Sequence, residues 1–144
     1  MSVALHLQTA PKVDVLIVDD NPFMRAAVAR ILQRQGRQCV AVATLDAAKM
    51  TLIDHPTAIV LTDFSLGSRD TGVDLVRWIR SQPGLGSIPC GIMSGSNRGQ
   101  ITDALREAGL GPVPLLEKPF GLGDLEIFLA SLAPPRNTVT GGVP

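Results

Sequence analysis

Residues 13–22 read Val-Asp-Val-Leu-Ile-Val-Asp-Asp-Asn-Pro, and this is the stretch from which the fold is predicted. The run before the paired aspartates is mainly apolar and β-branched, which is typical of a strand covered on both faces. Asp19 and Asp20 end that run. Asn21 followed by Pro22 then favours the start of a helix, with asparagine as the N-cap and proline at the first helical position. The stretch therefore predicts a strand, an acidic turn and a helix in direct succession.

The same succession recurs along the rest of the chain. Short apolar runs alternate with segments in which apolar residues recur at the spacing of a helix. Strands that alternate with helices form a parallel sheet with right-handed crossovers, so that helices cover both faces. We therefore predict an α/β fold, a doubly wound sheet of five parallel strands with five helices. The predicted strands are residues 13–18, 39–43, 58–61, 90–93 and 113–116, and the predicted helices are residues 23–35, 46–54, 73–81, 100–108 and 122–132.

The length of 144 residues and the composition indicate one globular domain. Hydrophobic residues make up 45% and charged residues 18%, which excludes a disordered chain. The formal net charge of +0 gives no basis for direct nucleic-acid binding. No apolar run approaches the roughly 20 residues that span a bilayer, and the N-terminus lacks an export signal. We expect a cytoplasmic protein without a membrane segment, with a flexible segment at 1–11, the folded domain at 12–132 and a disordered tail at 133–144.

Polar residues follow the predicted strands at the points where the strands end. Asp19 and Asp20 follow the first strand, Asp63 the third, Ser94 the fourth and Lys118 the fifth. In open α/β sheets, ligands bind beyond the carboxyl ends of the strands, so these side chains are expected to converge at one edge. Each residue alone has an ordinary explanation as a turn former, a helix cap or a surface charge. The joint pattern favours a functional site.

Carboxylates gathered at one edge require cations nearby. Two of them about 4 Å apart repel each other by roughly 4 kcal/mol at an effective dielectric constant of about 20. Lys118 supplies one positive charge, and an oxygen-only ligand set favours Mg²⁺ for the rest. A carboxylate beside Mg²⁺ and an ammonium group can attack a phosphoryl group and carry it as an acyl phosphate. The sequence lacks the glycine motifs of nucleotide hydrolases and of dinucleotide enzymes.

Four short motifs lie at these strand ends: Val18-Asp19-Asp20, Thr62-Asp63-Phe64, Met93-Ser94-Gly95 and Lys118-Pro119-Phe120. Together they resemble the receiver domain of bacterial two-component response regulators, in particular single-domain, chemotaxis-regulator-like proteins. The resemblance covers residues 13–132, with the motifs in the same order and strand context. It implies a flavodoxin-like sheet with the strand order 2-1-3-4-5.

The resemblance also implies a phosphoryl acceptor and a metal site. Asp63 would accept a phosphoryl group from a phosphohistidine on a sensor histidine kinase or a histidine phosphotransfer protein. The Mg²⁺ cofactor would be bound by Asp19, Asp20, Asp63 and the backbone carbonyl of Ser65.

Two further roles and one departure follow from the same resemblance. Lys118 would contact the phosphoryl group, with a cis peptide bond to Pro119 that sets its backbone geometry. Ser94 would be the switch hydroxyl. Leu115 stands three positions before the lysine, where receivers usually carry an aromatic residue, and the chain has no tyrosine. We therefore expect an atypical coupling between the switch and the protein surface.

These roles together imply a phosphorylation-dependent signalling protein. We expect a single-domain response regulator whose phosphorylation changes its binding to an output protein that the sequence does not name. It would not be a turnover enzyme, although its acyl phosphate would hydrolyse slowly. The alternative, which Leu115 keeps open, is a receiver-like interaction module that works without phosphorylation. Trp78 has two interpretations, a ring lying over a neighbouring helix or a contact for a partner, including a second copy of the chain in a homodimer.

Overall fold

The computed structural model describes residues 11–67, 69–95 and 97–132. The predicted tail at 133–144 lies outside the described residues, as does the predicted N-terminal segment apart from residue 11. Among the described helices, none is long and apolar enough to cross a membrane. The elements are β1 (Val13–Val18), α2 (Pro22–Arg34), β2 (Cys39–Val42), α3 (Leu45–Asp54), β3 (Thr57–Asp63), α4 (Gly72–Ser81), β4 (Cys90–Ser94), α5 (Arg98–Glu107), β5 (Leu115–Glu117) and α6 (Leu122–Leu132).

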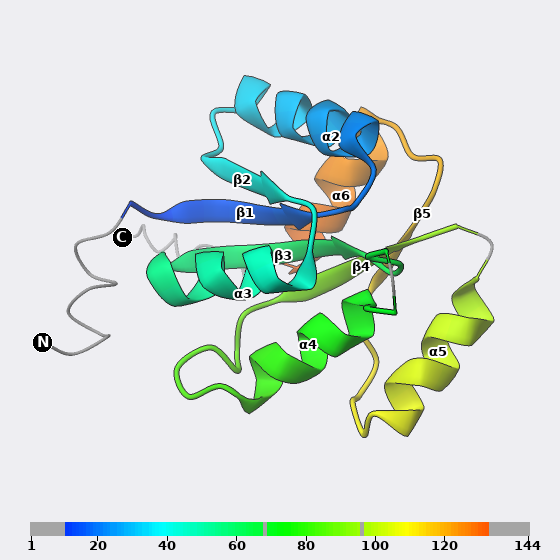
Figure 1. Ribbon diagram of the computed structural model, residues 1–144. Helices are drawn as coiled ribbons and strands as arrows, with labels where there is room; N and C mark the ends of the chain where they lie inside the picture. Colours follow the sequence, from blue (N-terminus) through cyan, green and yellow to red (C-terminus); the bar gives the residue numbers. More distant parts are fainter. Residues whose placement is uncertain (1–10, 68, 96, 133–144) are drawn as a thin grey trace, which may run out of the picture.

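The strands form one parallel sheet in the order β2-β1-β3-β4-β5 (Figure 1). β3 is central and pairs with β1 and β4, whereas β2 pairs only with β1 and is an edge strand. The register sets Val18 of β1 beside Thr62 of β3, and Ser94 of β4 beside Glu117 of β5. The predicted doubly wound fold and the flavodoxin-like strand order are confirmed, and the strand ends meet at one edge.

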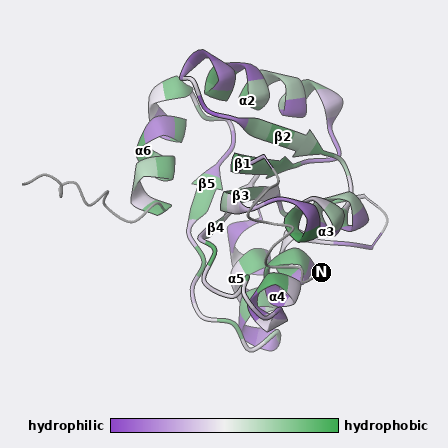
Figure 2. Ribbon diagram, turned by 90° about the vertical axis from the view of Figure 1, so that its left-hand side faces the viewer, coloured by the Kyte–Doolittle hydropathy of each residue, from purple (hydrophilic) through white to green (hydrophobic). Residues whose placement is uncertain are grey.

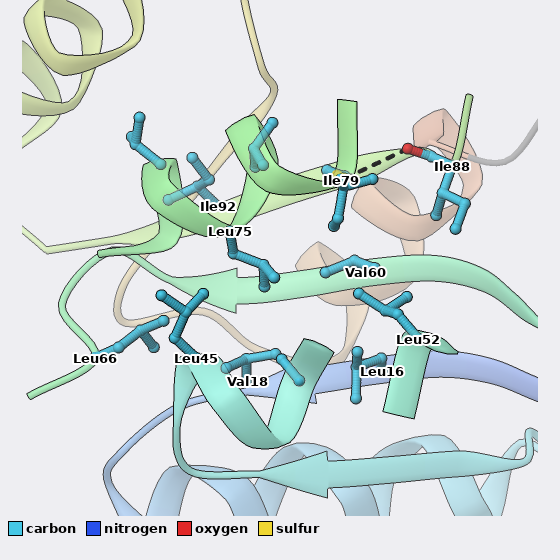
Figure 3. Packing of buried hydrophobic residues seen from close by; sticks show 14 of the residues in the cluster. Leu16, Val18, Leu45, Leu52, Val60, Leu66, Leu75, Ile79, Ile88 and Ile92 are labelled. Atoms are coloured by element: carbon cyan, nitrogen blue, oxygen red, sulfur yellow. Dashed lines mark hydrogen bonds between the residues drawn. The ribbon is translucent and has the colours of Figure 1, made fainter. Parts of the chain in front are cut away.

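Helices cover both faces of the sheet and divide the core into two layers (Figure 1). The first layer lies under α3, α4 and α5, and the second lies under α2 and α6. Residues of β1 alternate between them: Leu16 and Val18 belong to the first layer, Val15 and Ile17 to the second. Figure 2 shows mainly apolar strands in the middle, whereas polar and apolar residues alternate along the helices around them. Figure 3 shows the first layer at close range.

Polar side chains begin most of the helices at the carboxyl edge of the sheet. Asn21 caps α2 by accepting two backbone N–H groups of the first turn, at 2.9 and 3.2 Å. Thr44 caps α3, and Thr71 caps α4 in a reciprocal capping box. At α5 the N-cap residue is Asn97, whose side chain makes no capping hydrogen bond. The first turn of α5 is therefore fixed less firmly than those of α2, α3 and α4.

Four strands differ from their predicted bounds. β2 ends at Val42 instead of residue 43, and the other three differences bear on the site. β3 extends to Asp63 and β4 extends to Ser94, so both residues belong to regular strands rather than to the loops beyond them. The apolar pattern missed these ends because the ladders continue through polar residues. β5 begins at Leu115 instead of residue 113, where Pro114 has no N–H to donate to the ladder.

Trp78 is half-buried on α4, where it packs against the first layer. The ammonium nitrogen of Lys49, on α3, lies 5.6 Å from the centroid of its ring, a cation–π contact. This geometry agrees with the interpretation of a ring lying over a neighbouring helix. A role of Trp78 in contacting a partner or a second copy stays a prediction.

Candidate functional site

The carboxylates predicted at the strand ends converge in the structure. Asp19, Asp20 and Asp63 each place a carboxylate oxygen within 4.8 Å of the others. Asp19 and Asp20 follow β1, and Asp63 ends β3, the strand that pairs with β1. Asp19 is fully buried, Asp20 is exposed, and Asp63 lies between these extremes. The pairing of two neighbouring strands is thus sufficient to bring all three acids together.

Lys118 also lies beside this acidic group. It follows β5, which lies on the opposite side of β3 from β1 in the strand order. Its Nζ lies 2.8 Å from Oδ1 of Asp63 and donates a hydrogen bond to Oδ2 of Asp19 at 3.4 Å. The predicted cis peptide bond between Lys118 and Pro119 is present. The side chain of Lys118 is 24% exposed, so the ammonium group faces the acids rather than open solvent. The convergence of amine and carboxylates expected from the sequence is found.

The pKa values of Asp63 and Lys118, which form this ion pair, are shifted by different causes. Burial raises the pKa of Asp63, the nearby charge of Asp19 raises it further, and the hydrogen bond from Lys118 opposes the rise. Burial by itself would lower the pKa of Lys118, but the contacts with Asp63 and Asp19 outweigh it and raise that pKa. Lys118 therefore stays charged, while the ionised form of Asp63 lacks full compensation and favours an additional cation.

Ser94, the last residue of β4, is fully buried beside this group. Its Oγ has no hydrogen-bond partner among the described residues, whereas its carbonyl accepts the backbone N–H of Lys118 at 2.7 Å. An unpaired buried hydroxyl costs free energy. The hydroxyl is therefore available to a polar group that arrives at the edge of the sheet next to it.

The described part of the loop between β3 and α4 comes close to Asp20 at Gly67. A bridge pairs Ser65 with Thr71, and the backbone N–H of Gly72 donates to the carbonyl of Phe64 at 2.6 Å. Gly67 adopts a φ of 73°, and a Cβ there would lie 3.4 Å from Oδ2 of Asp20. Gly67 therefore leaves room for little more than a hydrogen atom beside the carboxylate of Asp20. Metal binding by the Ser65 carbonyl stays a prediction.

Three contacts around Asp19 and Asp63 were not predicted. The backbone N–H of Asn21 donates to Oδ1 of Asp19 at 2.9 Å, a turn that the Asp-x-Asn spacing could have indicated. The hydroxyl of Thr62 donates to the carbonyl of Asp63, and the guanidinium of Arg25 donates to the carbonyl of Asp19, both at 2.9 Å. These last two bonds end on backbone atoms, for which a side-chain pattern carries no signal.

The donor set fits a hard divalent cation. The acidic group offers carboxylate oxygens only, and a single ammonium group leaves it with excess negative charge. An oxygen-only ligand set of this kind favours Mg²⁺ over zinc, whose sites usually include nitrogen or sulfur ligands. Half-buried Leu115 begins β5 beside Ile92 and packs against the first layer, so no aromatic ring occupies its position.

Comparison with known proteins identifies the family. A family model described as the response regulator receiver domain matches residues 15–130. The chain belongs to this family. This receiver domain is 33% identical over 118 residues to an NtrX-like response regulator of Rickettsia bellii, covering 81% of this chain and 24% of that protein. It is 29% identical over 126 residues to the transcriptional regulatory protein KdpE of Mycobacterium tuberculosis, covering 86% of this chain and 52% of that protein.

Solved structures agree with the fold of this receiver domain. The receiver domain of NtrX from Brucella abortus superposes with a TM-score of 0.72 at 30% identity, covering 83% of this chain and 97% of that one. The chemotaxis response regulator CheY4 of Vibrio cholerae superposes with a TM-score of 0.73 at 21% identity, covering 85% and 99%. The NtrX-like relatives from Rickettsia are longer proteins, and this receiver domain spans about a quarter of their length.

Family membership shows the general function of this receiver domain. Receiver domains take part in phosphorylation-based two-component signalling, and they interact with sensor kinases and output partners. They generally bind Mg²⁺ at an acidic pocket, and the acidic group formed by Asp19, Asp20 and Asp63 is the corresponding feature of this chain.

Proposed function

We propose that this receiver domain accepts a phosphoryl group on Asp63, in a Mg²⁺-dependent reaction, from a phosphohistidine of a sensor histidine kinase or a histidine phosphotransfer protein. Phosphorylation then changes its binding to an output protein. The protein acts as a switch and not as a turnover enzyme, although the acyl phosphate hydrolyses slowly. Residues 12–132 are proposed as the unit that performs this function.

The observation that carries the proposal is that Asp19, Asp20 and Asp63 differ in burial and in hydrogen-bond partners. Asp19 is fully buried and its two oxygens already accept from Asn21 and Lys118, so it is poorly placed to attack. Asp20 is exposed and makes no ion pair with Lys118 within the described residues. Asp63 alone combines partial access, a lysine at 2.8 Å and a raised pKa. Asp63 is therefore the nucleophile that the arrangement favours.

In the proposed reaction, a carboxylate oxygen of Asp63 attacks phosphorus, and the bond between phosphorus and the donor imidazole nitrogen breaks. The imidazole leaves with the electron pair of that bond and takes up a proton from solvent. Lys118 neutralises charge on the phosphoryl oxygens during transfer. Bound Mg²⁺ supplies the remaining compensation, and Asp19, Asp20, Asp63 and the Ser65 carbonyl are the residues proposed to hold it.

Ser94 is proposed to detect the phosphoryl group. Its unpaired buried hydroxyl can donate to a phosphoryl oxygen on Asp63, because the residue before it, Met93, pairs with Asp63 across the sheet. The new bond satisfies the hydroxyl and shifts the population of the loop between β4 and α5. With Leu115 at the start of β5, this shift reaches the surface without the rotation of an aromatic ring.

The test is phosphorylation with a small-molecule donor. Wild-type protein incubated with acetyl phosphate and Mg²⁺ is expected to gain one base-labile phosphoryl group by intact mass, and none in EDTA. Asp63→Asn is expected to abolish the gain. Asp70→Asn, which alters an exposed aspartate of the same loop outside the acidic group, is the matched control and is expected to react normally. A phosphoryl group on Asp63→Asn, or none on wild type with any donor, contradicts the proposal.

The alternative function is a receiver-like interaction module that works without phosphorylation. Leu115 favours it, because the aromatic residue that usually couples switch and surface is absent from its position. A module of this kind would bind its partner equally with wild type and with Asp63→Asn, in the presence or absence of beryllofluoride and Mg²⁺. A beryllofluoride-dependent change in partner binding, or in self-association, excludes it.

A further inference from the structure

Arg25 is a charged residue beside the acidic group to which the proposed function gives no role. It lies in the first turn of α2, and its Nη1 donates to the backbone carbonyl of Asp19 at 2.9 Å. The side chain is half-buried and forms no ion pair with a carboxylate in the described part of the chain. A guanidinium next to three acids thus bonds to a neutral peptide oxygen instead of a carboxylate.

The carbonyl that Arg25 holds belongs to the peptide between Asp19 and Asp20. The N–H of Asp19 is already fixed by the carbonyl of Val42, at 3.1 Å, and the N–H of Asn21 is fixed by Oδ1 of Asp19. The hydrogen bond from Arg25 adds a third contact to these two. The backbone on both sides of Asp20 is therefore held in place. Because Asp20 is exposed, the direction of its carboxylate depends mainly on this backbone.

We infer that Arg25 is a positioning residue of the proposed magnesium site, which it serves by fixing the peptide between Asp19 and Asp20. The inference rests on the proposed function, because it presupposes that these carboxylates bind Mg²⁺. It also gives a prediction with a definite sign. By Coulomb's law alone, removing a cation near the acids strengthens Mg²⁺ binding. Removing a positioning bond weakens it, because residues that orient metal ligands commonly change metal affinity by roughly tenfold or more.

The experiment compares wild type, Arg25→Gln, Arg25→Lys and Arg30→Gln. Glutamine is too short to reach the carbonyl, lysine keeps the charge and a single donor group, and Arg30 is an exposed arginine on the same helix that serves as control. The melting temperature of each metal-free protein is followed as MgCl₂ is added. The Mg²⁺ concentration needed for beryllofluoride binding, followed by ¹⁹F NMR, is the second measurement.

Arg25→Gln is expected to shift both Mg²⁺ midpoints upward by roughly tenfold. Arg25→Lys is expected to recover part of that loss, and Arg30→Gln to match wild type. The melting curves in EDTA show whether each variant is folded. If Arg25→Gln is unfolded, Arg25→Lys is compared with wild type instead. Midpoints that are unchanged or lower in both Arg25 variants overturn the inference while leaving the magnesium site intact. Absence of any Mg²⁺ response in wild type overturns the magnesium site and the inference with it.

Discussion

The 2.8 Å contact between Nζ of Lys118 and Oδ1 of Asp63 occupies an oxygen that the proposed reaction needs. An ammonium group at this distance withdraws electron density, so attack falls to the other carboxylate oxygen or follows a turn of Lys118 towards the incoming phosphoryl group. Asp19 accepts from Lys118 at 3.4 Å and keeps the amine in the site during such a turn. Buried Asp19 therefore serves Lys118 as well as the proposed metal.

A pH-dependent stability difference follows from the raised pKa of Asp63. Burial, the largest cause, makes the folded protein hold this proton more tightly than the unfolded chain does. The resulting stability is present below the ordinary carboxylate range, about pH 4, and is lost as pH rises through the raised pKa. Asp63→Asn does not titrate at this position. In EDTA, urea unfolding is therefore expected to show a stability difference that moves in favour of Asp63→Asn as the pH rises above about 4. A difference that moves towards wild type contradicts the shift.

Gly72 is expected to tolerate no side chain. A Cβ there would lie 2.5 Å from the backbone oxygen of Asp63 and 2.9 Å from Cγ2 of Thr62. We expect Gly72→Ala to destabilise the protein by about 1–3 kcal/mol in urea unfolding, because strand and helix must move apart. Gly99→Ala is the control: a Cβ at that position would have no neighbouring atom within 4 Å, and alanine in the first turn of α5 favours a gain of at most about 1 kcal/mol. Equal effects at the two glycines would show that the close approach is relieved without cost.

The site residues that could be predicted from the sequence are those whose side chains lie at strand ends. Asp63 and Lys118 were found because each follows an apolar run, and parallel strands end at one edge. Arg25 was not found, because the helical pattern shows only that it lies off the apolar stripe, and its bond ends on a backbone oxygen. The unpaired hydroxyl of Ser94 was also beyond prediction, since it depends on every atom packed around it.

At the scale of helices, two asparagines in equivalent places behave differently. Asn21 caps α2 with two hydrogen bonds, whereas Asn97 makes none to α5 and its Oδ1 is buried without a partner among the described residues. Asn21→Ala is expected to cost about 1 kcal/mol of unfolding free energy, the ordinary value of an N-cap. Asn97→Ala is expected to stay within about 0.5 kcal/mol of wild type, because no cap is lost. Equal losses in urea unfolding would show that Asn97 caps α5 in solution.

The bounds of the elements were predictable where apolar patterning and helix signals coincide. α2 begins at Pro22 with Asn21 as its cap, close to the predicted helix, and β1 matches its prediction. β3 and β4 run further than predicted, because Thr62, Asp63 and Ser94 keep strand geometry without apolar side chains. Their extra length places two site residues on the ladder itself, a more rigid support than a loop.

The strand order of the whole sheet rested on the family resemblance, because strand–helix alternation alone predicts a parallel sheet and leaves the order open. The sequence shows that position 115 carries no aromatic ring. The effect of this on partner binding depends on the difference between the unphosphorylated and phosphorylated conformations, and the structure describes a single conformation. The proposed roles of the site residues stay predictions for the same reason.

Stability of the whole domain is expected to depend on Mg²⁺. A ligand that binds only the folded state stabilises it by mass action, by about 2.7 kcal/mol at one hundred times the dissociation constant. Asp20→Asn removes one repelling carboxylate, so its melting temperature in EDTA is expected to rise slightly above that of wild type, and its Mg²⁺ response to shrink. Asp70→Asn provides the control. A wild-type melting curve that does not move on chelation rules out the metal assignment.

The sheet separates the two core layers completely, and the acidic edge is the place where loops from both of them meet. Leu52 packs only in the first layer and Leu129 only in the second. A mutation in one layer should therefore have little effect on packing in the other. Truncations at these two leucines are expected to lower the free energy of unfolding additively. Each side is also free to be remodelled by mutation, so that new recognition properties can evolve beneath α2 and α6 while the half beneath α3, α4 and α5 retains its own.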